Sequence, residues 1–277
     1  EKRELTVVKT FAGSFRFRVN IFFQKDLPSL SFNNIPLNAK NIADLKLPPV
    51  INDLGKLNSG LFIVAGPQLS GKTTTATAII EEMNKNTNKR VITLEDPIEY
   101  LFVSKKSIVE QRQIGKDVNT ILDGIDYCLK EDVDVVYIGE AKKDFDQVVP
   151  DILNLASGNA FVVFEVNADS SVRVLEKIIN SLKSSMSLEA ARYSLADILV
   201  GVIVQKLVPR VGGGMVLARE ILLVNSAVKS LIREGRIYQV ESILQTSRKE
   251  GMISMEKSLE ELGRAGEIKE SFRIQLT

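Results

Sequence analysis

The segment that most constrains how this chain can fold is a glycine-containing loop, Gly66-Pro67-Gln68-Leu69-Ser70-Gly71-Lys72-Thr73. It fits the pattern G-x-x-x-x-G-K-[ST], in which backbone amides cradle phosphate groups. The apolar run 61–65 before the loop predicts a buried parallel strand, and residues 74–83 after it predict a helix. Because the start of such a helix favours an anion, the sequence predicts a binding site for a nucleoside triphosphate. A glycine turn without a ligand is the alternative.

Two side chains of the loop are candidates for direct contact with the ligand. Lys72 would reach the terminal phosphates, and the Thr73 hydroxyl would hold Mg²⁺. Leu69 stands where many such loops carry glycine, although the pattern leaves that position free. The predicted nucleotide-binding residues are consecutive: Gly66, Pro67, Gln68, Leu69, Ser70, Gly71, Lys72, Thr73 and Thr74.

Carboxylates follow two further apolar runs. Residues 91–94 lead into Glu95-Asp96-Pro97-Ile98-Glu99, and residues 134–138 lead into Gly139-Glu140. Ligands of α/β proteins bind beyond the carboxyl ends of parallel strands, so these acids are expected near the loop. An apolar strand that ends in an acid is typical of a Walker B motif, whose carboxylate faces Mg²⁺. An acidic turn at Pro97 and an exposed acid at a strand end are the alternatives.

The rest of the chain alternates between strand and helix patterns, which predicts an α/β fold with a parallel sheet. The further elements expected are a helix over 118–129 capped by Asp117, a strand over 160–164, a helix containing Leu195, Ile198 and 202–207, a turn at 212–214, and mostly helix from 226 onward.

The N-terminal region follows a different pattern. Residues 15–24 alternate, with apolar side chains on one face and Arg16, Arg18 and Asn20 on the other, which predicts a half-buried strand. The two arginines are either functional or simply a solvated edge. Prolines interrupt residues 27–49, so we expect a linker there with a short helix at 42–45 and a domain boundary near 47.

Composition excludes several classes of function. A net charge of +1 over 277 residues gives no indication of a nucleic-acid surface. The chain has no histidine, which removes the commonest general base, and its single cysteine suits a reducing compartment. No apolar run approaches the roughly 20 residues of a membrane helix, and no signal peptide is visible. We therefore expect a cytoplasmic protein and, because the first residue is Glu, a fragment of a longer one.

Taken together, the motifs resemble the PilT/GspE-type secretion ATPases, which are RecA-like hexameric motors. The resemblance covers nearly the whole chain. The matching segments are 16–20 (end of the N-terminal domain), 47–49 (linker), 93–99 (aspartate box), 111–117 (the loop after it), 130–134 with 139–140 (Walker B), and 227–234 and 251–255 (pilus-retraction branch).

The resemblance implies a RecA-like P-loop ATPase core over 48–277, with a helical C-terminal part from about 186, and the remnant of an N-terminal α+β domain with its linker over 1–47. Glu99 would be a base or water-orienting acid, and Glu140 would organise Mg²⁺ through water. Arg18 and Arg112 would neutralise charge on the transferred phosphoryl group, partly from a neighbouring subunit. The implied ligands are ATP and Mg²⁺.

The implied partners are further copies of the chain in a hexamer and an inner-membrane platform protein, which would place the protein peripherally at that membrane. No nucleic acid is expected.

Three departures from the family pattern stand out. The histidine box matches Gly158-Asn159 through Glu165-Val166-Asn167, with asparagines near both histidine positions. Ala141-Lys142-Lys143-Asp144 replaces the usual segment after the Walker B acid, and Leu69 replaces a glycine. Asparagine can donate or accept a hydrogen bond but cannot take up a proton.

Three functions are therefore considered. The first is a hexameric motor of the type IV pilus or type II secretion kind, of the retraction branch. The second is a nucleotide-binding paralogue with weak or no hydrolysis, which acts as a regulatory or structural partner. The third is a RecA-like recombinase or helicase, against which the near-neutral charge argues.

Overall fold

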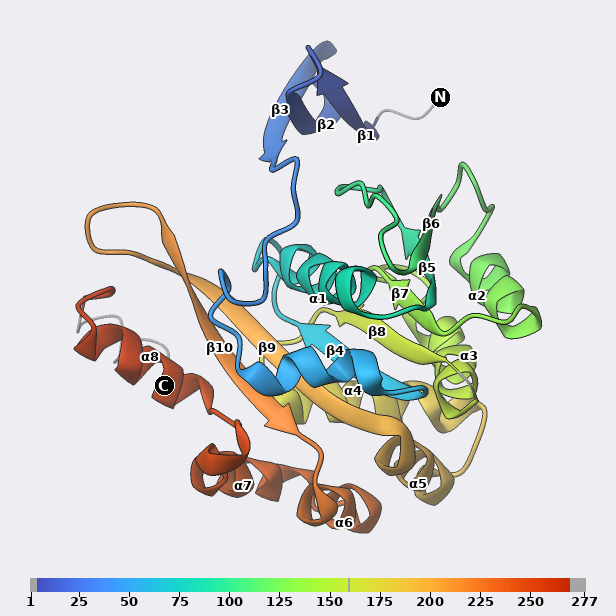
Figure 1. The fold of residues 1–277 in the computed structure, drawn as a ribbon, viewed down its shortest axis with the longest axis vertical. Coiled ribbons are helices and arrows are strands. Elements are labelled where there is room, and N and C mark those ends of the chain that lie inside the picture. Colours follow the sequence, from blue (N-terminus) through green and yellow to red (C-terminus); the bar gives the residue numbers. More distant parts are fainter. Residues whose placement is uncertain (1–3, 159, 270–277) are drawn as a thin grey trace.

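Two β-sheets organise the chain, an antiparallel sheet of three strands and a mostly parallel sheet of seven (Figure 1). The computed structural model describes residues 4–158 and 160–269. The small sheet lies at one end of the molecule, and the segment from residue 36 onward connects it to the large one (Figure 1).

The seven-stranded sheet forms the centre of the fold, with the strand order β10-β9-β4-β8-β7-β5-β6. All its pairs are parallel except β9 with β10. Every residue of β4 and β8 is buried, as the continuous apolar runs in the sequence predict. The strands are β4 (Gly60–Ala65), β5 (Arg90–Glu95), β6 (Ile108–Gln113), β7 (Val135–Ile138), β8 (Phe161–Val166), β9 (Leu199–Pro209) and β10 (Met215–Leu223).

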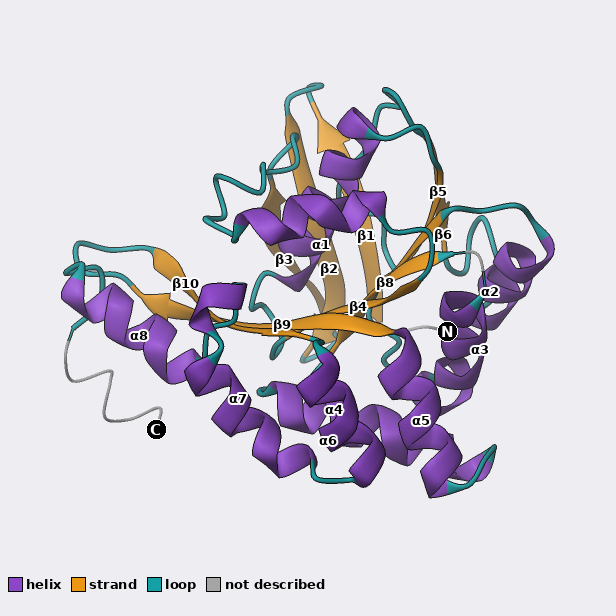
Figure 2. Cartoon of the chain, turned by 60° about the horizontal axis from the view of Figure 1, so that its bottom comes forward, coloured by secondary structure: helices purple, strands orange, loops and turns teal. Residues whose placement is uncertain are grey.

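Helices cover both faces of this sheet (Figure 2). The helix after the phosphate loop packs on one face together with the 3₁₀ helix Pro49–Lys56, and several helices pack on the other. The α-helices are α1 (Lys72–Asn86), α2 (Ile121–Lys130), α3 (Phe145–Ser157), α4 (Ser171–Ser181), α5 (Leu188–Ile198), α6 (Ser226–Glu234), α7 (Val240–Thr246) and α8 (Met255–Arg264). None of the helices described is long and apolar enough to span a bilayer.

The three-stranded sheet consists of β1 (Glu4–Phe11), β2 (Phe15–Gln24) and β3 (Leu27–Ile35). The alternation over 15–24 correctly predicted β2. The prediction of a linker from residue 27 was wrong for its first nine residues, because β3 tolerates Pro28 near the start of an edge strand. The short helix expected at 42–45 is a series of turns. The division into two domains near residue 47 stays a prediction.

Two other expectations were wrong. Residues 202–207 belong to β9 and not to a helix, so the region from 186 contributes two strands to the sheet between α5 and α6. Short apolar runs do not distinguish a buried strand from a buried helix. Asp117 does not cap α2, because Thr120 does so in a capping box with Asp123.

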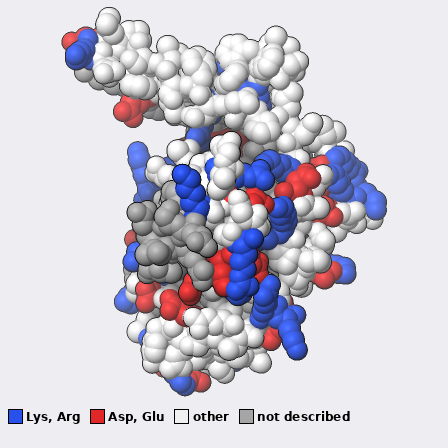
Figure 3. Space-filling model, turned by 90° about the vertical axis from the view of Figure 1, so that its left-hand side faces the viewer, with Lys and Arg blue, Asp and Glu red and all other residues white. Residues whose placement is uncertain are grey.

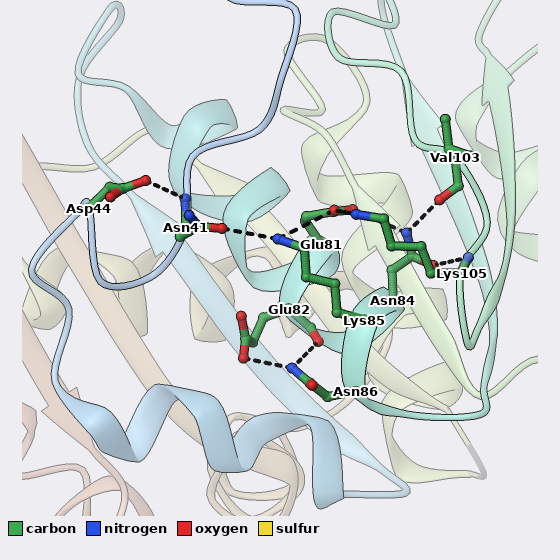
Figure 4. A network of polar contacts seen from close by, with 9 residues as sticks. All are labelled: Asn41, Asp44, Glu81, Glu82, Asn84, Lys85, Asn86, Val103 and Lys105. Atoms are coloured by element: carbon green, nitrogen blue, oxygen red, sulfur yellow. Dashed lines mark hydrogen bonds and ion pairs between the residues drawn. The ribbon is translucent and has the colours of Figure 1, made fainter.

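A polar network on the second half of α1 joins three segments of the core (Figure 4). The Asn84 side chain donates to the Val103 carbonyl at 2.9 Å and accepts from the Lys105 amide at 3.0 Å. Glu81 pairs with Lys105. Lys85 donates to Asn41 at 3.0 Å, in the segment that connects the two sheets. The helix that begins at the phosphate loop is thereby tied to the β5–β6 connection and to the connecting segment.

Candidate phosphate site

The loop between β4 and α1 has the backbone that its sequence predicts. Gly66 has a φ of +154°, and a Cβ there would lie 2.4 Å from the Gln205 carbonyl oxygen, so a side chain is excluded. Leu69, at the position where a glycine is common, has a φ of +61° and is 76% exposed. It therefore holds a left-handed conformation that costs a non-glycine residue about 1–2 kcal/mol.

Lys72 is buried and points back into the loop. Its Nζ donates to the carbonyl oxygens of Gly66 and Pro67, each at 3.0 Å, and lies 3.1 Å from Glu140 Oε2. Glu140 follows β7, and the Gly139 amide before it donates to the Leu94 carbonyl of β5 at 2.9 Å. The structure thus brings the lysine of the loop and the acid after β7 into direct contact.

The two threonines that follow Lys72 face different partners. The Thr74 hydroxyl lies 3.1 Å from the Tyr100 hydroxyl. The Thr73 side chain lies near the carboxylate of Glu165, on β8, and lowers its pKa. Glu165 accepts a hydrogen bond of 2.6 Å from the Tyr137 hydroxyl.

Glu165 and Glu95 are two buried carboxylates beside the loop. Burial raises the pKa of each to about 7, and the hydrogen bonds that each accepts oppose this rise. Glu95 Oε1 accepts from Thr93 at 2.6 Å and from Gln111 at 3.2 Å, whereas its Oε2 has no partner within the described residues. The sequence indicated that Glu95 lies near the loop but gave it no individual role. It gave no indication of Glu165, although Glu165 is the one charged residue within the buried strand β8.

The N-terminal sheet reaches the core through its arginines. Arg18 Nη1 lies 2.5 Å from Glu99 Oε1, and Arg16 donates to the carbonyl oxygens of Glu99 and Ile98 at 2.5 and 3.0 Å. The interpretation of these arginines as a solvated edge was therefore wrong. Arg18 and Glu99, predicted separately from distant parts of the sequence, form one ion pair.

Arg112 lies elsewhere. Its guanidinium stacks on the Tyr127 ring, 3.7 Å from the centroid, and its Nη2 lies 3.4 Å from Glu110 Oε2. It does not line the cavity over the loop. The structure does not bring it together with the other predicted site residues.

That cavity has a volume of about 850 Å³. Residues 68–74 form its floor, and Glu99, Glu140, Arg18 and Glu165 contribute to its walls. This is the size of a small-ligand pocket. The second asparagine of the altered histidine box, Asn167, donates to Glu140 Oε1 at 3.5 Å, at the outer limit of a hydrogen bond. The first, Asn159, lies outside the described residues.

The cavity supplies two kinds of group at its floor. Backbone amides and Lys72 are suited to phosphate oxygens. The Thr73 hydroxyl and the carboxylates of Glu140 and Glu165 are oxygen donors of the kind that Mg²⁺ prefers. No group of three or more Asp, Glu or Cys side chains that could hold a metal ion occurs among the described residues.

Comparison with known proteins agrees with this site and fold. The family model described as "Type II/IV secretion system protein" matches residues 29–271. A twitching motility protein of Neisseria gonorrhoeae is 33% identical over 252 residues, which cover 91% of this chain and 67% of that protein. The type IV pilus retraction ATPase PilT of Pseudomonas aeruginosa is 30% identical over 250 residues, which cover 90% of this chain and 72% of that one.

The solved structures include an equally similar relative. The crystal structure of the pilus retraction motor PilT with bound ADP superposes with a TM-score of 0.89 at 32% identity, and the match covers 100% of this chain and 78% of that one. The central sheet, the phosphate loop on β4 and these similarities lead to one assignment: the chain belongs to the type II/IV secretion system protein family, with a PilT-like RecA fold.

Proposed function

We propose that this chain binds and hydrolyses ATP as the subunit of a hexameric motor of the type IV pilus or type II secretion kind, and that it serves pilus retraction. The observation that carries the proposal is the contact of Lys72 with both the phosphate loop and Glu140 beneath one cavity. The similarity to PilT and to the twitching motility protein supports the retraction branch.

The bound nucleotide would lie with its phosphates on residues 66–74. Thr73 and Glu140 would hold Mg²⁺, Glu140 through water. Bound there, the cation would neutralise charge on the phosphates. Lys72 would exchange its carbonyl contacts for phosphate oxygens, and Glu99 or Glu140 would orient the attacking water.

Arg18 would place its positive charge at the same cavity, held by Glu99 of its own chain. For Arg112, which lies outside that cavity, we keep the role of serving the nucleotide of a neighbouring subunit. Hydrolysis would then depend on assembly, because each site would be completed by a second copy. Nucleotide-dependent closing and opening of successive interfaces would deliver work to an inner-membrane platform protein. The motor would act in the cytoplasm at that membrane, with residues 1–47 as part of a separate N-terminal domain.

A weakly hydrolysing paralogue is the second candidate, and one contact favours it. Asn167 lies 3.5 Å from Glu140, where the family pattern has a histidine. Since an amide cannot take up or carry a proton at neutral pH, Asn167 could orient a water molecule but not accept its proton. This candidate shares the binding site and differs only in turnover.

Steady-state ATPase activity and ATP affinity, measured at concentrations that allow assembly, test both candidates. For the motor we expect turnover that Lys72→Ala and Glu140→Gln abolish, with Lys72→Ala also weakening ATP binding. Lys183→Ala, an exposed lysine outside the cavity, is the matched control and should leave both unchanged. Tight ATP binding without turnover in the unaltered protein would select the paralogue, and no ATP binding would contradict both.

A further inference from the structure

Gln205 of β9 lies directly beneath the phosphate loop. β9 runs parallel to β4, with Val204 opposite Ala65. The next residue on β9 is therefore level with the first residue of the loop, Gly66, and a Cβ on Gly66 would lie 2.4 Å from the Gln205 carbonyl oxygen. Side chains alternate along β9, and Ile203 packs in the apolar cluster that contains residues of α1. The Gln205 side chain therefore extends to the same side of the sheet, where the loop turns into α1.

The side-chain amide of Gln205 contacts the loop in one orientation. Its Nε2 donates to the Ser70 carbonyl at 2.9 Å, and the residue is 0% exposed. Only the NH₂ group of a glutamine can donate to a carbonyl oxygen, so this contact fixes which end of the amide faces the loop. The same nitrogen lies 3.3 Å from the position that a Cβ would take on Gly71. The amide therefore meets the peptide group that joins Ser70 to Gly71.

Packing does not account for a glutamine at this position. The Gln205 Oε1 atom is buried without a partner among the described residues, and so is the Ser70 hydroxyl. Because an unpaired buried polar atom costs free energy, an apolar side chain of similar length would pack here at lower cost. The hydrogen bond to the Ser70 carbonyl is what an apolar side chain could not supply.

The geometry of the peptide group transmits this contact to the other side of the loop. The C=O and N–H groups of one trans peptide are coplanar and point in opposite directions. Because the Ser70 carbonyl is held toward β9, the Gly71 amide of the same peptide points away from β9. Gly71 lines the cavity over the loop, where phosphate oxygens would accept hydrogen bonds from backbone amides.

Resting on the proposed function, we propose that Gln205 is a positioning residue of the phosphate site, which holds the Ser70 carbonyl against β9 and thereby keeps the Gly71 amide directed at the phosphates of the nucleotide. Gln205 does not line the cavity, so it acts through the loop and not by touching the ligand. The assignment makes β9, which the sequence pattern did not indicate as a strand, part of the phosphate site.

Asn84 offers a matched control at the other end of α1. It is also 0% exposed, and its side-chain amide donates to the Val103 carbonyl at the same distance, 2.9 Å (Figure 4). Gln205→Met and Asn84→Leu each remove a buried amide and approximately keep the side-chain volume. Both should lower the free energy of unfolding, because each leaves a backbone carbonyl without its donor. Only Gln205→Met should change the orientation of the loop.

The test is ADP binding by the full chain, measured by calorimetric titration near neutral pH. For Gln205→Met we expect binding about tenfold weaker or more, because hydrogen bonds to charged groups are the stronger ones. Asn84→Leu should bind ADP within about twofold of the unaltered protein. Thermal denaturation establishes that each variant is folded at the temperature of the titration.

A second variant, Gln205→Glu, separates hydrogen-bond donation from packing. Its carboxyl group can donate to the Ser70 carbonyl only while it is protonated. Burial raises the pKa of such a group, so we expect the ADP affinity of this variant to recover as the pH falls from about 8 to about 5.5. Gln205→Met should stay equally weak over this range. Each affinity is expressed relative to that of the unaltered protein at the same pH, which accounts for other groups that titrate there.

An unchanged ADP affinity in a folded Gln205→Met protein would overturn the assignment, as would a Gln205→Glu affinity equal to that of Gln205→Met at every pH. An equal loss of affinity in Asn84→Leu would also overturn it, because the loss would then follow stability alone. Absence of ADP binding in the unaltered protein would instead contradict the proposed function, so the two failures are distinguishable.

Discussion

Side chains alternate between the two faces of every strand, but the two sheets of this protein bury different kinds of side chain. In the seven-stranded sheet, apolar side chains face helices on both sides and are fully buried. In the three-stranded sheet, Phe15, Phe23 and Phe32 are about half exposed or more, while the face with Arg16 and Arg18 lies toward the core. Figure 3 shows the three-stranded sheet as the upper part of the molecule, with few charged side chains on the side in view. An alternating strand therefore does not by itself reveal which of its faces is buried.

The contrast also separates residues that stabilise the fold from residues that contribute to the candidate site. The large sheet is stabilised by burying apolar area, and it fixes where the loop and its acids lie. The small sheet is joined to the core by polar contacts from Arg16 and Arg18, at the rim of the cavity. Substitutions in the first should alter the free energy of unfolding, and those in the second should alter turnover.

The largest expected difference is between two phenylalanines. Phe164 is 0% exposed and stacks on Phe145 at 5.8 Å, whereas Phe15 is 59% exposed. Phe164→Ala should lower the free energy of unfolding by about 3–5 kcal/mol. Phe15→Ala should lower it by less than about 0.5 kcal/mol. Urea denaturation measures both, and equal losses would refute the contrast between the sheets.

The next effect is on pH dependence and comes from Glu95. Its pKa is raised by burial to about 7, so the folded state holds the carboxyl proton more tightly than the unfolded chain. Stability should therefore fall as pH rises from about 4.5 to 7, by on the order of 3 kcal/mol for this group. Glu95→Gln should remove that part of the decline. Urea denaturation of the unaltered protein and of Glu95→Gln between pH 5 and 8 measures the difference.

Two glycines with positive φ offer a comparison at the level of binding. A Cβ on Gly66 would meet the Gln205 carbonyl at 2.4 Å, whereas a Cβ on Gly13 would have nothing within 4 Å. Gly66→Ala should distort the phosphate loop and weaken ATP binding about 100-fold or more, near 3 kcal/mol. Gly13→Ala should cost about 1 kcal/mol of stability and leave affinity unchanged. Calorimetric titration with ATP distinguishes them.

The smallest effect expected concerns the ion pair between the sheets. Arg18→Ala and Glu99→Ala should each slow ATP hydrolysis about tenfold, and the double variant should be slowed by less than the product, because the two side chains act as one unit. Lys9→Ala, an exposed residue on β1, is the control. Multiplicative losses would show that Arg18 and Glu99 act independently.

Much of the core could be predicted because local pattern and global position agree there. The phosphate loop, the strands before Glu95 and Glu140, and β8 are each marked by a short apolar run followed by polar residues. β9 was missed because its apolar run continues directly from α5 without a turn signal. Its Gln205, buried against Ser70, would have been the clue, since a polar side chain there needs a partner outside its own segment.

The sequence indicated which residues belong to the candidate site better than it indicated how those residues pair. Local patterns indicated Lys72 and Glu140, and the family resemblance added Glu99 and Arg18, but neither could show which of these residues pair. The contact of Lys72 with Glu140 and the hydrogen bond from Tyr137 to Glu165 join residues far apart in the chain, and such contacts leave no local periodicity. Only the strand order brings them together.

That strand order also bears on how the chain is made. Among the residues that the structure describes, β4 pairs only with β8 and β9, which begin at Phe161 and Leu199, about a hundred residues or more later. At about 5–20 residues per second, the strand that carries the phosphate loop emerges from the ribosome several seconds before either partner exists. During that interval an apolar segment has no sheet to join, which makes the nascent chain a natural client for chaperones.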